Sequence, residues 1–183
     1  MRPIPDSYQV EFSALPVSAP PGLLLAGEYA GAKDLSETRH RMERFLDAGV
    51  SLFVDLTEEN EYPLPYAPTL TAVANERNVT AKHLHMPIRD YSTPTGEQLS
   101  SILDELDERL SEGKTIYVHC WGGIGRTGTV IGCWLVRHGL TGAQALAQIA
   151  TWRATIPSAA CPSPETEEQR NMILNWHESL INK

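Results

Sequence analysis

The chemistry of this chain is concentrated in one glycine-rich segment that begins with Cys120 and ends with Arg126, called the glycine loop below. Three of the five residues between these ends are glycines. Small residues allow successive backbone N–H groups to turn inward and form a concave site for an anion, which the N-terminus of a following helix reinforces. The same field favours the thiolate of a cysteine, the nucleophilic form. The segment therefore predicts a phosphate site with a sulfur nucleophile.

The other residues of this segment also have expected roles. Arg126 can present two N–H groups to two phosphate oxygens and stabilise the charge that spreads over them in the transition state. Thr127 follows at once and brings a hydroxyl near the sulfur. Trp121 is expected either to pack under the loop or to form a wall of the pocket. The expected phosphate-binding residues are His119, Trp121, Gly122, Gly123, Ile124 and Gly125.

The charge distribution is an independent indication of an anion site. The chain carries a formal net charge of −8 at pH 7. Residues 114–163 nevertheless contain no Asp or Glu, and they contain the cations Lys114, Arg126, Arg137 and Arg153. This local positive potential favours a phosphate dianion together with a thiolate.

Two other phosphate-binding patterns overlap with the loop, and each lacks a required residue. Residues 123–128 satisfy the G-x-G-x-x-G fingerprint of dinucleotide-binding folds. That fingerprint needs an acidic residue about 20 positions later for the ribose, and the acid-free stretch contains none. A nucleotide-triphosphate loop needs Gly-Lys-Ser/Thr, whereas Gly125 is followed by Arg126.

In the residues of its glycine loop, the chain resembles the cysteine-dependent protein tyrosine phosphatases. Residues 120–127 match the family's Cys-x5-Arg-Ser/Thr loop, and His119 and the glycines strengthen the match. The length and a short upstream loop with an aspartate look most like the small dual-specificity branch. The resemblance runs from about Leu23 to the C-terminal helix and implies that branch's fold and a cysteinyl-phosphate intermediate. Rhodanese-like sulfurtransferases also cradle a cysteine, but their usual loop is shorter.

The resemblance implies a general acid on a loop between a strand and the long helix that leads to the nucleophile strand. Asp90 has this position, 30 residues before Cys120. By resemblance, Asp90 protonates the leaving oxygen and then activates the water that attacks the intermediate. Nearby Ser92 and Pro94 leave a plain turn residue as the other interpretation of Asp90. Asp55 is the alternative acid, although its strand context favours a structural role.

Two further roles come from the same resemblance. Thr127 would stabilise the thiolate as it leaves in the second step. Gln169 resembles a downstream glutamine that positions water in some members of the family.

Alternating strands and helices must position these residues. Buried or β-prone runs predict strands at residues 23–26, 50–56, 81–86 and 114–119. Helices are predicted from a cap at Ser36 to Gly49, through residues 70–74, from a cap at Thr95 to Gly113, and through residues 129–136. Another helix is predicted to begin at a cap at Thr141. The last is predicted to begin at Ser163 and Pro164 and to run through Trp176 and Leu180. This alternation predicts a single α/β domain with a central, mostly parallel β-sheet flanked by helices.

Prolines and acidic residues mark the segments outside these elements. Proline lacks a backbone donor and restricts the residue before it, and prolines crowd the N-terminal segment. We therefore expect residues 1–22 to be an extended arm over the domain and residues 23–183 to form the catalytic domain. The acidic stretch 58–61, followed by prolines, is expected to be a solvated loop.

The composition argues against several partners. An acidic chain is a poor general binder of nucleic acid or anionic membranes. The sequence has no apolar run near the ~20 residues of a membrane helix, no signal peptide at its start, and too few cysteines for a disulfide framework, so we expect a cytoplasmic protein.

Cys133 is expected in the core and Cys161 in a loop, and either could form a protective disulfide with Cys120. His and Cys lack zinc-site spacing, so we expect no metal, and no cofactor is implied.

The expected activity is removal of phosphate from phosphotyrosine in proteins, with phosphoserine and phosphothreonine as further candidates. The interior of the loop, Trp-Gly-Gly-Ile-Gly, has no lysine. A highly charged phosphoinositide would favour extra cations there, so a protein or aryl phosphate is the preferred substrate. The alternatives are a phosphoinositide or other small-molecule phosphatase, and a phosphate-binding module without turnover.

Overall fold

The computed structural model describes residues 2–61 and 64–177. Its centre is a five-stranded sheet of order β1-β2-β5-β3-β4. The strands are β1 Ser7–Val10, β2 Leu23–Gly27, β3 Val50–Asp55, β4 Lys82–His85 and β5 Thr115–His119. Strands β2, β5, β3 and β4 each run parallel to the next one in this order, and β1 pairs antiparallel with β2. The predicted, mostly parallel sheet is confirmed.

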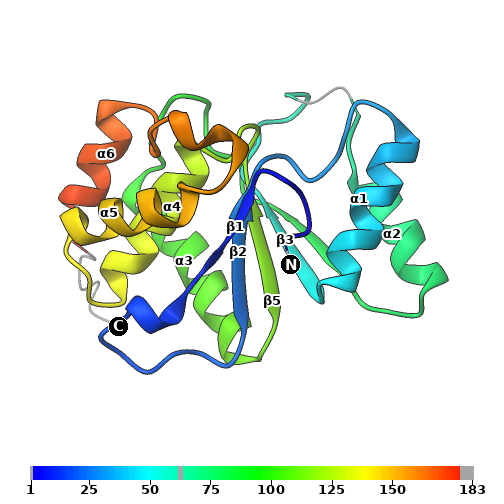
Figure 1. Ribbon diagram of the computed structural model, residues 1–183, viewed down its shortest axis with the longest axis horizontal. Helices are drawn as coiled ribbons and strands as arrows, with labels where there is room; N and C mark the ends of the chain where they lie inside the picture. The colour runs from blue at the N-terminus through cyan, green and yellow to red at the C-terminus, as the bar shows by residue number, and fades with distance from the viewer. Residues whose placement is uncertain (1, 62–63, 178–183) are drawn as a thin grey trace.

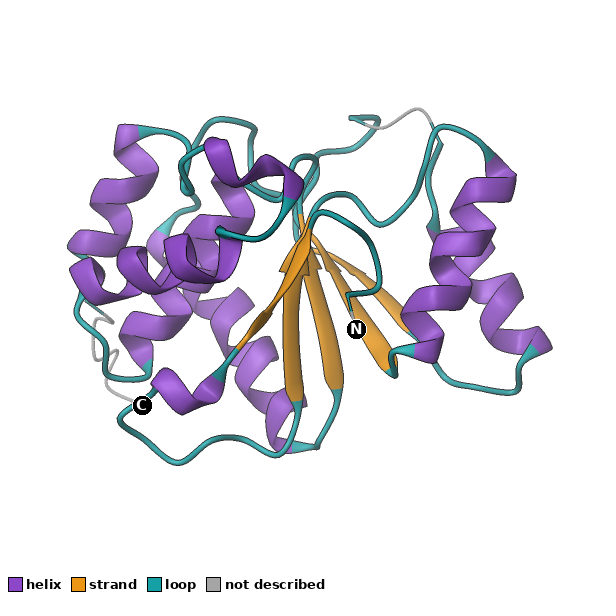
Figure 2. Ribbon diagram, in the orientation of Figure 1, coloured by secondary structure: helices purple, strands orange, loops and turns teal. Residues whose placement is uncertain are grey.

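Helices cover both faces of the sheet, which gives three layers (Figures 1 and 2). They are α1 Leu35–Asp47, α2 Ala67–Glu76, α3 Gly96–Ser111, α4 Gly125–Arg137, α5 Gly142–Arg153 and α6 Glu167–Leu174. Two short 3-10 helices are η1 Phe12–Ala14 and η2 Pro157–Ala160. Helices α1 and α2 lie on one face, and α3 to α6 lie on the other (Figure 1). The single-domain α/β fold is thereby confirmed.

The middle residues of the central strands are mostly apolar because both faces of these strands are buried. In β5, Ile116 and Val118 belong to the larger core under α3 to α5. Tyr117 between them belongs to the smaller core under α1 and α2, where its ring lies 4.5 Å from that of Phe45. Successive side chains of a strand point to opposite faces, so one short run supplies both cores.

Several helix ends follow their sequence signals. The Thr95 side chain accepts a hydrogen bond from the Gln98 N–H at the start of α3, and Thr141 forms a capping box at the start of α5. Gly113 and Gly139 follow the ends of α3 and α4 with φ values of +76° and +98°. Only glycine adopts that conformation at no steric cost, which explains why these helices end there.

Two predicted helix starts are wrong. Helix α1 is capped by Asp34, which accepts from the Glu37 N–H, and not by Ser36. Aspartate and serine are equally good caps, and the sequence pattern did not separate them. Helix α6 begins at Glu167 and not at Pro164, because the Thr166 side chain caps it by accepting from the Gln169 N–H. The helix ends at Leu174, before Trp176, and Leu180 lies outside the described residues.

Part of the segment expected as an arm is a strand of the sheet. Strand β1 pairs residue by residue with β2. Ile4, Tyr8 and Val10 are buried, and the Tyr8 ring stacks on Trp152 of α5 at 6.2 Å. The prolines lie on either side of this strand and leave its backbone donors intact. The domain boundary at residue 22 stays a prediction.

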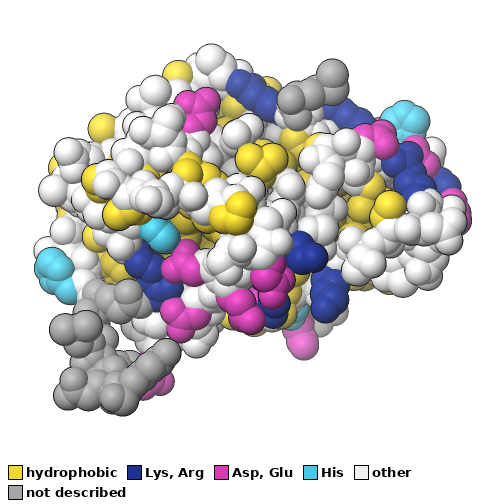
Figure 3. Space-filling view, turned by 90° about the horizontal axis from the view of Figure 1, so that it is seen from below, with side chains coloured by type: hydrophobic (Ala, Val, Ile, Leu, Met, Phe, Trp, Pro, Cys, Tyr) yellow, Lys and Arg dark blue, Asp and Glu magenta, His cyan; other side chains and the backbone are white. Residues whose placement is uncertain are grey.

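The loops that position the site leave the sheet at one edge. Because β2, β3, β4 and β5 are parallel, the loops that follow them meet at the carboxyl ends of the strands, at the top of Figure 1. Strand β5 lies between β2 and β3, so the glycine loop emerges between two neighbouring loops. At the opposite end of the molecule, acidic and basic side chains are interspersed (Figure 3). No helix within the described ranges combines the length and hydropathy of a membrane span.

Candidate active site

The glycine loop connects the end of β5 with the first turn of α4, and four of its carbonyl groups are bound from outside the cavity. The pairs are Cys120 O with His119 Nδ1 (3.2 Å), Trp121 O with Tyr29 N (2.8 Å), Gly123 O with Arg153 Nη1 (2.9 Å), and Ile124 O with Ser163 Oγ (2.7 Å). In a trans peptide the C=O and the next N–H point in opposite directions. Each of these bound carbonyls therefore directs the following N–H toward the inside of the loop, the arrangement that an anion nest requires.

A cavity of about 180 Å³ lies inside the loop. Its lining residues are Asp90, Tyr91, Cys120, Trp121, Gly122, Ile124, Gly125, Arg126 and Glu165. Cys120 is only 3% exposed. The predicted nucleophile, guanidinium and general acid thus line one cavity, although Asp90 precedes Cys120 by 30 positions.

Arg126 is almost fully buried and held on three sides. Its Nη1 donates to the carbonyl oxygens of Leu56 and Ile88 at 3.3 and 3.2 Å. Its Nη2 lies 3.0 Å from Asp90 Oδ1. Burial alone would lower the pKa of Arg126, but the hydrogen bonds to Glu61 and the nearby negative charges raise it above the ordinary value. The guanidinium is therefore a permanent cation, and its buried Nε has no partner within the described part of the chain.

Glu61 is a site residue that the sequence did not indicate. Its carboxylate binds Arg126 through two contacts, 2.5 Å to Nη2 and 2.7 Å to Nη1. Glu58 of the same stretch accepts the Asp90 N–H at 3.0 Å. The expectation of a solvated acidic loop is therefore wrong for Glu61, which is half-buried, whereas Glu58 is exposed. Glu61 and Arg126 are 65 positions apart, so no local pattern could have paired them.

We expect Glu61 to position Arg126, because Glu61 is not among the residues that line the cavity. Replacing it (Glu61→Gln) should raise KM and the inhibition constant of inorganic phosphate by about threefold to tenfold. Hydrogen bonds to charged groups are worth roughly 1.5–3 kcal/mol, reduced here because the carboxylate is partly exposed. Steady-state kinetics with an aryl phosphate and phosphate as inhibitor would measure both constants.

The exposed neighbour Glu59 supplies the matched control, and Glu59→Gln should leave both constants unchanged. Burial alone would raise the pKa of Glu61, but the hydrogen bond from Arg126 lowers it below its ordinary value of 4.5. The contact is thus fully present above pH 4.5 and is lost as the pH falls through the lower folded-state value. If the Gln variant binds phosphate more tightly, Glu61 competes with the substrate and the positioning role is wrong.

His119 supports the loop from behind and does not line the cavity. Its side chain is fully buried, and its Nε2 lies 2.8 Å from the Tyr66 hydroxyl. Burial lowers the pKa of His119, so the ring is neutral near pH 7. A carbonyl only accepts, so the Nδ1 that contacts Cys120 O carries the proton, and Nε2 accepts from Tyr66.

Asp55, the alternative acid, ends β3 and also lies outside the cavity lining. Its carboxylate accepts from the Thr57 N–H and hydroxyl and lies 2.9 Å from His83 Nε2. Burial alone would raise the pKa of Asp55, but these hydrogen bonds and His119 lower it well below the ordinary value. Asp55 therefore stays ionised as a structural acceptor, which leaves Asp90 as the better-placed acid.

The remaining predicted site residues lie around the cavity. Thr127 is fully buried, and its hydroxyl has no partner among the described residues. Gln169 closes the capping box of α6, and its Nε2 donates to Ser92 O at 3.0 Å, on the loop that carries Asp90. A Cβ at Gly125 would lie 2.9 Å from the Gln169 amide, so the two residues are in close contact. The water-positioning role of Gln169 stays a prediction.

The three cysteines are free thiols. Cys133 is buried in α4 and Cys161 is exposed after η2. Burial raises the pKa of the Cys133 thiol to about 12, so it remains protonated. Within residues 2–61 and 64–177, no three His, Cys, Asp or Glu side chains come together as a metal site requires.

The family model described as "Polymorphic toxin system, DSP-PTPase phosphatase" matches residues 27–140, more than half of the chain. The chain belongs to this family. The matched range contains the glycine loop, Asp90 and Glu61. Membership confirms the resemblance to the small dual-specificity branch of the cysteine-dependent phosphatases.

Curated relatives match shorter segments. An uncharacterized protein of Methanocaldococcus jannaschii, MJECL20, is 34% identical over 94 residues, which is 51% of this chain and 58% of that protein. The putative tyrosine phosphatase 067L of Invertebrate iridescent virus 3 is 35% identical over 105 residues, 52% of this chain and 38% of that protein. The phosphatidylglycerophosphate phosphatase PTPMT1 of Arabidopsis thaliana is 36% identical over 75 residues, 40% of this chain and 22% of that protein. The chain thus spans between about a fifth and three fifths of these relatives.

Solved structures match a larger share of this chain than the curated relatives do. Kinase associated phosphatase has a TM-score of 0.74 at 20% identity and covers 95% of this chain and 98% of its own. The active form of Tk-PTP has a TM-score of 0.61 at 28% identity, with coverages of 82% and 88%. PTPMT1 in complex with PI(5)P has a TM-score of 0.60 at 19% identity, with coverages of 82% and 87%. The likenesses at 19% and 20% identity show the fold alone.

Proposed function

We propose that this chain hydrolyses phosphotyrosine in proteins, with phosphoserine and phosphothreonine as further substrates, through a cysteinyl-phosphate intermediate. The observation that carries the proposal is the single cavity lined by Cys120, Arg126 and Asp90. Its volume of about 180 Å³ suits a phosphate group with part of its leaving group. Family membership and the 28% identical Tk-PTP support the same chemistry.

In the first step, the Cys120 thiolate attacks phosphorus, and an S–P bond forms while the ester O–P bond breaks. Asp90 gives its proton to the leaving oxygen. Arg126 and the inward N–H groups of the loop hold the three non-bridging oxygens and the charge that develops on them. The buried Thr127 hydroxyl has no hydrogen-bond partner among the described residues, so it can donate a hydrogen bond to the Cys120 sulfur. In the second step, Asp90 takes a proton from water, the new O–P bond forms, and the S–P bond breaks to return the thiolate.

Two aromatic side chains support an aryl phosphate as the substrate. Tyr91 and Trp121 both line the cavity and are 61% and 46% exposed. Rings of this kind supply contact area for a flat aromatic group beside a polar site. Of the two roles expected for Trp121, the pocket wall agrees with this position. A phosphotyrosine ring could lie between these side chains while its phosphate enters the loop.

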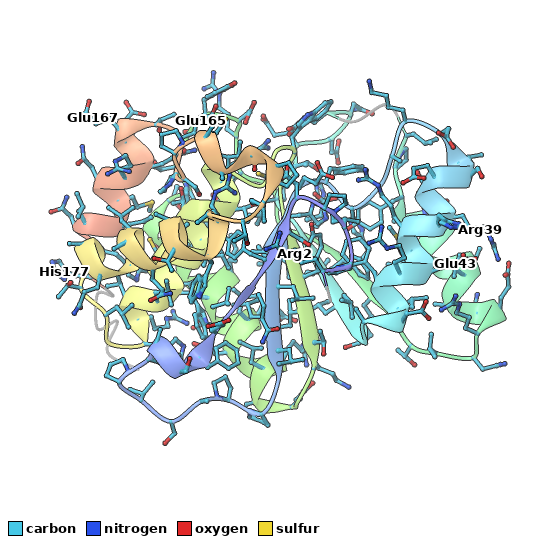
Figure 4. All side chains as sticks on the ribbon, in the orientation of Figure 1. Arg2, Arg39, Glu43, Glu165, Glu167 and His177 are labelled. Atoms are coloured by element: carbon cyan, nitrogen blue, oxygen red, sulfur yellow. The ribbon has the colours of Figure 1, made fainter. Side chains whose placement is uncertain are left out.

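The charges around the cavity support a protein over a polyanionic lipid. Asp90 and Glu165 line the cavity, and Glu165 lies on the segment that leads into α6 (Figure 4). Arg126 is the one cation in the lining among the described residues. Additional phosphates on a headgroup would face carboxylates here, and like charges placed together reduce affinity.

A lipid phosphatase is the second candidate because of specific relatives. PTPMT1 of Arabidopsis thaliana is named as a phosphatidylglycerophosphate phosphatase, and a PTPMT1 structure contains PI(5)P. Phosphatidylglycerophosphate and PI(5)P each carry one phosphomonoester beside the phosphodiester of the lipid, so each is less charged than a phosphoinositide with several phosphates. Both are therefore lipid competitors to be tested.

The substrate comparison that separates these candidates uses one peptide sequence with phosphotyrosine or phosphothreonine, PI(5)P, and phosphatidylglycerophosphate, each with chelator present. We expect kcat/KM for the phosphotyrosine peptide to exceed that for either lipid by about tenfold or more, because the carboxylates repel the lipid phosphates. Released phosphate would be measured under identical conditions.

A higher kcat/KM for either lipid would reverse the assignment. Equal values of kcat/KM for the two peptides would establish dual specificity and rule out a preference for phosphotyrosine. Absence of turnover on all four substrates, with inorganic phosphate still bound, would favour a phosphate-binding module.

A further inference from the structure

Arg153 is a buried cation outside the cavity, at the C-terminal end of α5. The residue is 3% exposed. Its Nη1 donates to Gly123 O at 2.9 Å, and its Nη2 donates to the carbonyl and the hydroxyl of Ser158 at 3.2 and 2.8 Å. No carboxylate touches Arg153 directly among the described residues. A buried charge is costly unless its donors are satisfied, so these oxygens must hold it in place.

The contact with Gly123 fixes one peptide of the glycine loop. Gly123 has φ +66°, which turns its carbonyl out of the nest toward Arg153. The peptide is planar, so the Ile124 N–H of the same unit points the opposite way, into the cavity that Ile124 lines. A charged donor on the carbonyl also polarises the peptide and strengthens this N–H as a hydrogen-bond donor.

The other side of Gly123 is closed by the end of β2. A Cβ on Gly123 would lie 2.3 Å from Gly27 C and 2.5 Å from Glu28 N. The loop backbone therefore rests against the chain between Gly27 and Glu28 and is held on the remaining side by Arg153. Both contacts therefore restrain the peptide in this orientation.

A second link connects Arg153 with the N-terminal segment. The Ser158 hydroxyl accepts from Arg153 and donates to Asp6 Oδ1 at 2.8 Å, and the Ser158 N–H donates to the same oxygen at 3.2 Å. The carbonyl of Asp6 accepts from the Glu28 N–H at 3.0 Å. Asp6 thus supplies a countercharge through Ser158 and also contacts the β2 end on which the loop rests.

We propose that Arg153 is a positioning residue for phosphate binding, and that Asp6, Ser158 and Arg153 form a brace that makes the N-terminal segment part of the active site. The inference rests on the proposed function. All three brace residues lie outside residues 27–140, the range that the family model matches. Arg2, labelled in Figure 4, adds a further tie from this segment, to the carbonyl oxygen of Thr155 at 2.7 Å.

The test replaces Arg153 and reads the loop directly. In Arg153→Met, the inhibition constant of inorganic phosphate should rise by about tenfold, less than the loss of a whole donor from an oxyanion site. The rate of Cys120 alkylation by iodoacetate at pH 7 should fall, because a cation behind the loop has been removed. Arg153→Lys should recover part of both effects. Asp6→Asn and Ser158→Ala should each weaken phosphate binding by about twofold to threefold.

Arg137→Met is the matched control. The Arg137 side chain is 10% exposed and pairs with Asp104 and Asp107 at the far end of α4, so its charge is balanced there and does not add to the potential at the glycine loop as the sequence suggested. Its replacement should lower Tm without changing phosphate binding or the alkylation rate.

Wild-type phosphate binding and an unchanged alkylation rate in a folded Arg153→Met protein would overturn the proposal. If that variant does not fold, wild-type phosphate binding in both Asp6→Asn and Ser158→Ala would overturn it equally. Neither readout needs turnover. A protein that hydrolyses no phosphoester but shows these shifts would contradict the proposed function and leave the brace intact.

Discussion

The Cys120→Ser variant should lose hydrolysis of p-nitrophenyl phosphate by a factor on the order of 10⁶, the size of loss seen when a covalent nucleophile is deleted. A serine hydroxyl remains protonated at neutral pH and cannot replace the thiolate in the attack on phosphorus. The cavity is otherwise unchanged, because sulfur and oxygen differ little in size. Arg126 and the inward N–H groups remain in place, so inorganic phosphate or tungstate should bind at least as tightly as to the wild type.

The measurement combines steady-state kinetics with titration calorimetry of the oxyanion. Cys161→Ser is the control, because that thiol is exposed and lies outside the cavity lining. It should retain full activity. Retained turnover in Cys120→Ser would mean that another group attacks phosphorus, and loss of oxyanion binding would mean that the substitution has disturbed the loop.

The Asp90→Ala variant should lower kcat on a phosphotyrosine peptide by about 10²- to 10⁴-fold, the usual contribution of a general acid and base. The loss should be much smaller for p-nitrophenyl phosphate, because a good leaving group departs without a proton. Phosphate binding should be retained or strengthened, since Asp90 Oδ1 lies 3.0 Å from the Arg126 Nη2 that the phosphate needs. Parallel kinetics on the two substrates measure this dependence on the leaving group.

Glu165→Gln is the comparison variant, because Glu165 is the other carboxylate that lines the cavity. We expect a modest change of the same size for both leaving groups. If Glu165→Gln shows the leaving-group dependence and Asp90→Ala does not, Glu165 is the acid. Equal activity of Asp90→Ala and wild type on phosphotyrosine would rule out Asp90.

The features predicted correctly from the sequence are those set by short stretches of chain. Thr95 and Gln98 mark the start of α3 because the capping hydrogen bond spans only three residues. Gly113 and Gly139 end helices because their backbone conformation is local. The glycine loop is recognisable for the same reason, since nucleophile, glycines and guanidinium are contiguous.

The features that were missed depend on contacts across long stretches of chain. The bidentate pair of Glu61 and Arg126 joins loops after β3 and β5, and an exposed acidic loop has the same composition as one that holds an arginine. Strand β1 was not expected, because four residues between prolines gain stability only from pairing with β2. Asp90 was placed by resemblance, and its approach to Arg126 became visible only in the fold.

The sequence by itself determined that this chain has an α/β fold with a cysteine and an arginine around a phosphate-sized loop, because local backbone geometry and hydrophobic periodicity specify these features. The tertiary structure alone decided which groups hold that loop in shape. Tyr29, Arg153 and Ser163 bind its carbonyl oxygens from three distant segments. The Tyr29 contact exists only because parallel strands bring their following loops to one edge, and the contacts of Arg153 and Ser163 need the packing of α5 and α6 against α4, so no local propensity records them.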